Sequence, residues 1–353
     1  MPRETPLPFL TAERPGIGGR LKDRPEDFVV EEIPAYEPCC EGEHLFLWIE
    51  KTDVAADELS RHIARALRIS PRDVGMAGLK DRRAVTRQFV SVPATSEPSI
   101  GRIETERIRL LRIARHRTKL RTGHLRGNRF SLLVREVDAE AKARCAAIAE
   151  TIGRLGFPNY YGEQRFGREG ETLKMGLDLL RGVTRPDSIA PVRRRFLLRM
   201  SLSSVQSALF NDVLAERLRD GLFSTVLPGD VMQVAASGGQ FVATDANVEQ
   251  RRFESRETIL TGPIFGPRMN APQFEPATRE ARALSDWGVA AEDFVRFPKL
   301  TSGTRRPVVI WPEELRIESE AEGLRFWFSL PSGVYATMLL REFLKTTGDE
   351  SPC

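Results

Sequence analysis

The sequence predicts an α+β protein built on a mixed sheet. Segments with the two-residue period of strands are interspersed with segments at helical spacing, and their order lacks the regular strand-helix-strand repetition of a doubly wound parallel fold. The chain has 353 residues, of which 41% are hydrophobic and 29% charged. This length and composition are typical of a folded globular protein with about two domains.

The first half of the chain shows both patterns. In the segment 20–34 the apolar residues Phe28, Val30 and Ile33 favour an extended strand, and HLFLWIEK from His44 predicts a second one. Leu59, Ile63 and Leu67 lie at helical spacing within 57–67. Further predicted elements are strands at 87–92 and 129–137 and a helix at 139–155. The turn-rich sequence GMAGLKDRRA separates the first helix from the strand at 87–92.

The second half begins with a cluster of aromatic and glycine residues, PNYYGEQRFGREG, from Pro158. The elements predicted after it are a helix at 203–221, a β-rich stretch at 229–244, a helix at 280–287, a connection at 301–306, strands within 307–311 and 324–330, and a helix within 335–345. The closing strands resemble the opening ones in period and apolarity. We therefore expect the first and last parts of the chain to form one sheet domain, with the middle inserted.

Several classes of protein are disfavoured by what the chain lacks. No apolar stretch approaches the roughly 18 to 20 residues of a membrane span, and the opening MPRETPLPFLTAERPG does not resemble a signal peptide. A cytoplasmic protein is expected. The four cysteines, Cys39, Cys40, Cys145 and Cys353, include no CxxC spacing, so we expect neither a disulfide framework nor a metal site.

The positive charge is concentrated in one segment. Residues 107–135 contain nine arginines, one lysine and no acidic residue, whereas the rest of the chain carries 43 basic and 49 acidic residues. Such a segment suits a polyanion, because neutralising phosphates releases condensed counterions. The alternative is a solvated basic face in an arginine-rich chain. We favour nucleic acid as the partner.

The common cofactor and nucleotide motifs are missing. The chain contains no GxxxxGK[ST], HExxH or GxSxG sequence, and no glycine-rich strand-to-helix loop for a methyl donor. One carboxylate, Asp81, lies in a glycine-bearing turn among Lys80, Arg82 and Arg83, cations that favour its ionised form. An ionised carboxylate is a potential nucleophile, whereas on local pattern alone a turn or helix-capping aspartate is the simpler interpretation.

Seven segments, in order along the chain, resemble those of the TruD-type tRNA pseudouridine synthases. They are KDRPEDFVVEEIP from Lys22, AGLKDRRAVTRQFVSV from Ala77, TKLRTGHLRGNRF from Thr118, PNYYGEQRFG from Pro158, QSALFND from Gln206, TGPIFG from Thr261 and LPSGVYATMLLRE from Leu330. A single GLKD sequence would be weak evidence. The ordered set spans nearly the whole chain and changes the interpretation of Asp81 from structural to catalytic.

The resemblance implies isomerisation of a uridine in RNA to pseudouridine, with uridine 13 of tRNA as the expected target. It implies a mixed, mainly antiparallel catalytic domain from residues 1–156 and 305–353, and an inserted α/β TruD-type domain at 157–304. Neither a cofactor nor a metal is expected, and a monomer is favoured. The remaining alternatives are a noncatalytic RNA-binding protein and another RNA-modifying enzyme such as a methyltransferase.

The resemblance also assigns roles to residues of the catalytic domain. Asp81 is the essential carboxylate, acting as a nucleophile on ribose or base or by assisting a glycal route, and Lys22 pairs with it. Phe130 stacks on the target base after the base leaves the helix. Asn128 is a hydrogen-bonding partner for the active site or for the base edge. The structural alternatives are an exposed lysine, a core aromatic at position 130 and a turn asparagine.

The same resemblance makes the basic segment an RNA-binding element, because phosphate contacts position the RNA while a separate pocket holds the base. The candidates for backbone contacts are Arg115, Arg117, Lys119, Arg121 and Arg126. A second set of RNA-binding candidates, Tyr160, Gln164, Arg165 and Phe166, comes from PNYYGEQRFG. Aromatic residues beside glycines are equally typical of a packed hinge.

Overall fold

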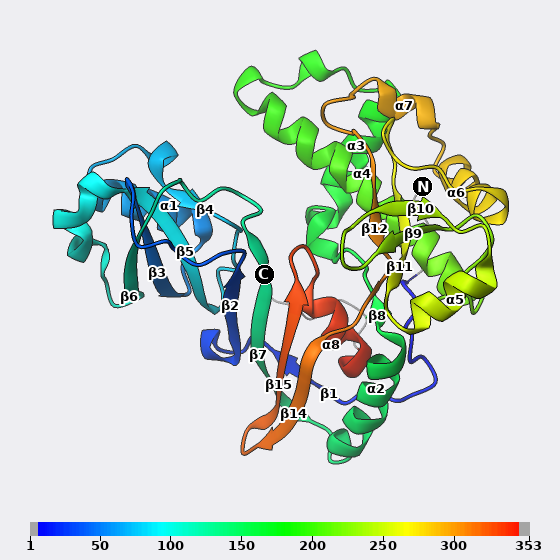
Figure 1. Ribbon diagram of the computed structural model, residues 1–353, viewed down its shortest axis with the longest axis horizontal. Helices are drawn as coiled ribbons and strands as arrows, with labels where there is room; N and C mark the ends of the chain where they lie inside the picture. Colours follow the sequence, from blue (N-terminus) through cyan, green and yellow to red (C-terminus); the bar gives the residue numbers. More distant parts are fainter. Residues whose placement is uncertain (1–5, 346–353) are drawn as a thin grey trace. The chain divides into compact units, whose positions relative to one another are not determined.

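A computed structural model describes residues 6–345 of the chain (Figure 1). The described residues divide into two compact units. The sheet unit comprises Gly16–Ala149 and Pro312–Ala336. The helical unit comprises the described residues up to Pro15, Glu150–Trp311, and those from Thr337 onwards. The division falls within helix α2 (Ala141–Leu155).

The described residues of the sheet unit form one nine-stranded sheet in the order β14-β15-β7-β2-β5-β3-β6, with β1 beside β7 and β4 beside β5. The strands are β1 Gly18–Leu21, β2 Phe28–Pro34, β3 His44–Thr52, β4 Gly75–Met76, β5 Val85–Pro93, β6 Ile108–His116, β7 Leu125–Val137, β14 Glu313–Glu320 and β15 Gly323–Pro331. Of these pairings, β2 with β5 is parallel and the others are antiparallel. The predicted mixed sheet is confirmed.

The core of the sheet unit follows the alternation of its strands. Leu45, Leu47 and Ile49 lie on one face of β3 and are fully buried. They form a hydrophobic cluster with Leu59 and Ile63 of helix α1 (Ala56–Leu67), which lie one turn apart on the helix. This helix therefore covers one face of the sheet at β3 and β5. Strands from both ends of the chain share the sheet, because β15 pairs with β7 along its whole length.

The helical unit has a four-stranded antiparallel sheet in the order β10-β9-β11-β12 and a small β8-β13 pair. Its strands are β8 Phe157–Pro158, β9 Val231–Val234, β10 Gln240–Val242, β11 Thr258–Ile264, β12 Thr304–Pro307 and β13 Val309–Ile310. Its helices are α3 Glu171–Leu180, α4 Pro191–Arg219, α5 Ala246–Glu254, α6 Phe274–Asp286, α7 Ala291–Val295 and α8 Ala336–Leu344.

Helix α4 contributes to the core of the helical unit. Its residues Leu198, Leu202 and Val205 are buried against α3, which lies beside it (Figure 1). Gly176 of α3 permits this close approach, since a Cβ there would lie 2.2 Å from the carbonyl oxygen of Ser201. Neither α4 nor any other helix within residues 6–345 is long and apolar enough to cross a membrane.

Several elements differ from the sequence-based expectations, and three of them illustrate the physical reasons. Helix α4 begins at Pro191 rather than near Ser203, since proline is well suited to the first helical position and arginine and leucine continue the helix. The expected connection at 301–306 contains the start of β12, which is held by pairing with β11. Strand β14 was not predicted, because an exposed edge strand rich in glutamate lacks the apolar alternation.

The β7–β15 contact leads to a testable prediction. A Cβ on Gly127 would lie 2.2 Å from the carbonyl oxygen of Leu330 in the paired strand. We expect Gly127→Ala to lower the free energy of unfolding by about 1–3 kcal/mol, because the clash is with backbone that the pairing holds. The measurement is urea denaturation, with Gly101→Ala as the control, since nothing lies within 4 Å of its added Cβ. Equal stability of the two variants would contradict the prediction.

Candidate active site

Asp81 lies in a loop, residues 77–84, between β4 and β5 of the sheet unit. The loop is anchored where it enters β5, because the amide of Asp53 donates to the carbonyl oxygen of Ala84 at 3.1 Å. In its middle, the Nζ of Lys51 donates to the carbonyl oxygen of Asp81 at 2.9 Å. The backbone of the candidate catalytic residue is therefore held directly by a side chain of the sheet.

The carboxylate of Asp81 is paired with Lys22. The distance from Lys22 Nζ to Asp81 Oδ2 is 3.0 Å, and the two side chains are 25% and 44% exposed. Lys22 has a φ of 65°, a conformation that costs a non-glycine residue on the order of 1 kcal/mol. Its Nζ also lies 4.1 Å from the centroid of the Phe28 ring. The structure thus brings together the lysine and the aspartate that the resemblance pairs.

Lys51 is a buried cation that the sequence analysis missed. Its side chain is 0% exposed, and its Nζ donates to the carbonyl oxygen of Val54 at 2.6 Å as well as to Asp81. Burial lowers the pKa of Lys51 to about 8, against the opposing effect of the Asp81 carboxylate. A signal was present in the sequence, because Lys51 continues the inward alternation of Leu47 and Ile49 on β3.

A buried ion pair involves Lys80, the residue before Asp81 in the chain. Lys80 Nζ is 2.8 Å from Glu32 Oε2, and the two side chains are 5% and 0% exposed. Burial raises the pKa of Glu32, and the charge of Lys80 acts in the opposite direction. Removing one partner of such a pair leaves a charge in a site that water does not reach. Lys80 therefore ties the Asp81 loop to β2 through an interaction that the fold protects.

Phe130 is part of an aromatic group on the sheet. Its ring stacks on Phe328 with centroids 5.2 Å apart and meets the edge of Phe28 at 6.5 Å. It is 6% exposed. The Phe28 ring, in turn, is in contact with the Lys22 ammonium, which pairs with Asp81. The candidate base-stacking residue is therefore linked to the candidate carboxylate by consecutive contacts, while two neighbouring rings cover much of its surface.

Asn128 lies on a face of the sheet that carries other buried polar groups. Val30 of β2 pairs with Thr86 of β5 and with Phe130 of β7, so these three share one face. Gln88 lies two residues after Thr86 in β5, and Asn128 lies two residues before Phe130 in the antiparallel strand β7. Both therefore continue that face. Thr86 Oγ1, Asn128 Oδ1 and both amide atoms of Gln88 are buried, with no hydrogen-bond partner among the described residues. Such orphaned groups require a ligand or water to satisfy them.

Several cations of the basic segment, residues 107–135, have partners within the protein and are not available as its composition implies. Three of its predicted RNA-binding residues have partners: Arg115 contacts Glu97 at 2.5 Å, Arg117 contacts Glu41, and Lys119 donates to the carbonyl oxygen of Arg72. Glutamates far away in the sequence thus neutralise arginines at the edge strand β6. Arg121 and Arg126 are exposed, and their guanidinium groups make no hydrogen bond or ion pair within residues 6–345.

The second set of candidates lies in the helical unit. Tyr160 is 1% exposed and packs in the core with Phe210. Gln164 is exposed. Arg165 is half-buried and its Nε donates to Ser207 Oγ at 3.2 Å, and Phe166 packs beside the cluster that α3 and α4 form. Of the four residues, Gln164 thus offers the most accessible side chain.

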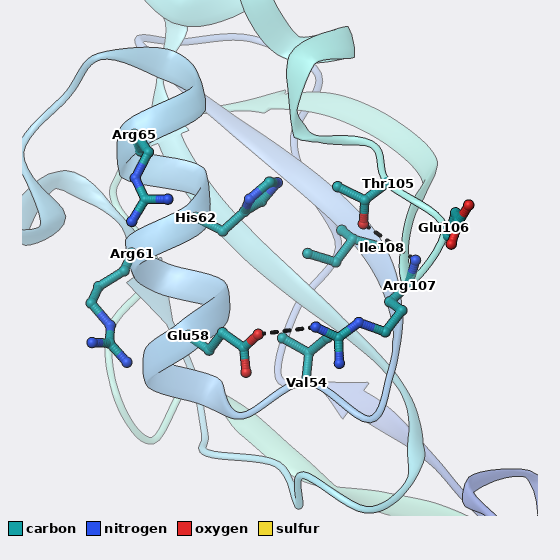
Figure 2. Close-up of a pocket in the computed structure, with 9 residues that line it drawn as sticks. All are labelled: Val54, Glu58, Arg61, His62, Arg65, Thr105, Glu106, Arg107 and Ile108. Atoms are coloured by element: carbon teal, nitrogen blue, oxygen red, sulfur yellow. Dashed lines mark hydrogen bonds and ion pairs between the residues drawn. The ribbon is translucent and has the colours of Figure 1, made fainter.

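A surface cavity of about 500 Å³ lies in the sheet unit between α1 and the start of β6 (Figure 2). Its lining includes Arg61, His62, Arg65 and Arg107, of which Arg107 pairs with Glu58 at 3.2 Å. None of the predicted site residues lines it. The orphaned polar groups and the Lys22–Asp81 pair, and not this cavity, mark the candidate active site.

The sequence model of the family described as tRNA pseudouridine synthase D (TruD) matches residues 7–186 and 188–343. The chain belongs to the tRNA pseudouridine synthase D family. This confirms the resemblance and makes the chain an isomerase of that family. A relative of that name from Anaeromyxobacter dehalogenans is 42% identical over 98% of both chains, and one from Thermus thermophilus is 40% identical over 96% of this chain and 92% of its own.

A solved structure agrees with the family assignment. The chain is similar to a crystal structure from Methanosarcina mazei that carries the name tRNA pseudouridine synthase D (TruD), with a TM-score of 0.77 and 25% sequence identity. The match covers 96% of each chain. The mixed α+β fold of this tRNA pseudouridine synthase D family member is therefore shared along nearly its whole length.

The buried Lys51 predicts a pH-dependent stability. Its pKa is about 8 in the folded state and near 10.5 when exposed, so the unfolded chain binds more protons between these values. The stability of the native protein relative to Lys51→Met should rise by about 1–3 kcal/mol between these two pKa values. Urea denaturation across this pH range measures the difference, with Lys142→Met, at an exposed lysine, as the control. A difference in stability between the native protein and Lys51→Met that does not change with pH would contradict the prediction.

The Lys80–Glu32 pair leads to a second prediction. Lys80→Met should lower the free energy of unfolding by about 3–5 kcal/mol at neutral pH, because it leaves the Glu32 carboxylate buried and unpaired. Adding Glu32→Gln should recover most of the loss. The control is Arg61→Met, since Arg61 and Asp57 are 66% and 73% exposed and such surface pairs contribute at most about 1 kcal/mol. A double variant no more stable than Lys80→Met would contradict this account.

Proposed function

We propose that the chain converts a uridine of tRNA, uridine 13, to pseudouridine. In this reaction the bond from N1 to C1′ breaks, the base turns, and a bond from C5 to C1′ forms, while C5 loses its hydrogen as a proton and N1 gains a proton. The product is an isomer, so the reaction needs no oxidant or reductant. The observation that carries the proposal is the Lys22–Asp81 pair on a loop held by buried lysines, in a chain of this family.

Asp81 is the proposed essential carboxylate. It attacks the ribose or the base, or it assists formation of a glycal intermediate. Lys22 orients the carboxylate, because its Nζ lies 3.0 Å from Asp81 Oδ2 and donates to it. Lys51 holds the main chain of Asp81. The carboxylate is thereby preorganised and undergoes little rearrangement when the substrate binds.

Phe130 and Asn128 are proposed to receive the base once it has left the RNA helix. A flipped base is read by stacking and by hydrogen bonds to its edge. Support for Asn128 comes from its buried side-chain oxygen, which lacks a partner within the described residues. Support for Phe130 comes from its contact with Phe28, whose ring carries the Lys22 ammonium. Gln88 lies on the same face and adds a further amide.

We further propose that residues 1–156 and 305–353 are the catalytic domain and that 157–304 are the inserted TruD-type domain. The proposed RNA-backbone contacts are Arg115, Arg117, Lys119, Arg121 and Arg126, with Gln164, Arg165 and Phe166 as contacts from the inserted domain. Tyr160 is 1% exposed in the core of the helical unit, so the RNA contact expected for it is not proposed. The exposed Arg121 and Arg126 are the strongest of these, because their guanidinium groups make no hydrogen bond or ion pair in the described part of the chain. We also propose that the protein is a monomer and that it is located in the cytoplasm.

Release of tritium from C5-labelled uridine in unmodified tRNA tests the reaction. We expect release by the native protein without added cofactor, and a loss of at least about 10³-fold in Asp81→Asn, because the group essential for the chemistry is removed. Asp57→Asn, at a 73% exposed aspartate of α1, should keep full activity. Replacing uridine 13 by cytidine in the transcript should abolish release.

Three outcomes would count against the proposal. Undiminished release by Asp81→Asn would remove that residue from the chemistry. Release that persists after replacement of uridine 13 would move the target to another nucleotide. Tight tRNA binding by the native protein without any release would favour a noncatalytic RNA-binding protein.

A further inference from the structure

The first turns of helix α4 expose apolar side chains without a packing partner. Val192 is 98% exposed and Phe196 is 64% exposed. They lie four residues apart and therefore on one face of the helix. The opposite face, with Leu198 and Leu202, is buried against the rest of the helical unit. The exposed residues thus contribute nothing to the core that α4 forms.

Two arginines continue the same face. Arg195 and Arg199 follow Val192 by three and seven residues, are exposed, and make no hydrogen bond or ion pair through their guanidinium groups within residues 6–345. The arginines of β6 differ, since Arg112 contacts Glu37 at 3.1 Å and Arg115 contacts Glu97 at 2.5 Å. The four residues Val192, Arg195, Phe196 and Arg199, here called the α4 stripe, combine uncompensated positive charge with an exposed aromatic ring.

The surroundings of the α4 stripe are also positive. Residues 181–200 contain six arginines and one acidic residue, Asp187. The helix begins at Pro191, and its first backbone amides add partial positive charge at the same end. A polyanion is therefore the partner whose charge complements this surface.

We infer that the α4 stripe binds RNA, with phosphates on Arg195 and Arg199 and an unpaired base stacked on Phe196. Arginine and aromatic side chains in alternation are the combination that binds single-stranded segments without reading sequence. A second copy of this chain is a poorer occupant, because a two-fold contact would bring two copies of the same positively charged patch together. The inference rests on the proposed function for the identity of the RNA, a tRNA, and assigns it a contact outside the reacting site.

Binding of unmodified tRNA as a function of salt concentration tests the inference. The double variant Arg195→Ala/Arg199→Ala should weaken binding at least about tenfold and reduce the slope of log affinity against log salt by about 1–2, because up to two phosphate contacts are lost. Phe196→Ala should weaken binding about tenfold with an unchanged slope, because stacking releases no counterions.

Matched controls come from the same unit. Arg251 is an exposed arginine of α5 without a side-chain partner in the described region, and Phe274 is 71% exposed. Arg251→Ala and Phe274→Ala should leave affinity and slope unchanged. If the control variants changed affinity and slope as much as the stripe variants, the effects would reflect a general loss of charge or surface. That outcome would overturn the inference.

Two further outcomes separate this inference from the proposed function. Stripe variants with native affinity would overturn the inference even if the native protein releases tritium. Stripe variants with weakened tRNA binding would support it even if no tritium were released, because the binding measurement does not depend on turnover. A self-association seen by sedimentation that Phe196→Ala abolishes, with tRNA affinity unchanged, would assign the stripe to a second copy instead.

Discussion

The arrangement of the candidate site depends on lysines that the sheet unit holds within it. Lys51 reaches the main chain of Asp81 from β3, and Lys80 is tied to Glu32 of β2, both largely out of contact with water. A buried ammonium is tolerated only where oxygen atoms replace its hydration. The loop at 77–84 supplies the Asp81 carbonyl oxygen to Lys51 and carries Lys80 to the Glu32 carboxylate, so its conformation and the burial of the lysines support each other.

This mutual dependence fixes the Asp81 backbone but leaves its carboxylate accessible. The side chain is 44% exposed and meets Lys22, which itself adopts an uncommon backbone conformation. Strained conformations persist where the surrounding structure determines them, and they concentrate at functional sites. A rigid main chain with an exposed, paired carboxylate is the arrangement that preorganised catalysis requires.

The distribution of charge in space differs from its distribution along the chain. The segment 107–135 has no acidic residue, yet arginines of β6 meet glutamates brought to them by folding, as in the contact of Arg115 with Glu97. On α4 the opposite holds, because Arg195 and Arg199 project from a helix face that no acidic side chain of the described region reaches. Whether an arginine is available to bind a phosphate thus depends on the acidic side chains that folding brings next to it.

The sequence by itself determined the α+β class, most of the strands and helices, and the family, because periodicity and ordered motifs are local properties of the chain. It also singled out Lys22 and Asp81, which the structure brings to hydrogen-bond distance. Only the tertiary structure decided that Lys51 is buried with its Nζ on the carbonyl oxygen of Asp81 and that Gln88 is buried, since burial depends on segments far apart in sequence. For the same reason it decided that Tyr160 lies in a core and that Phe196 does not.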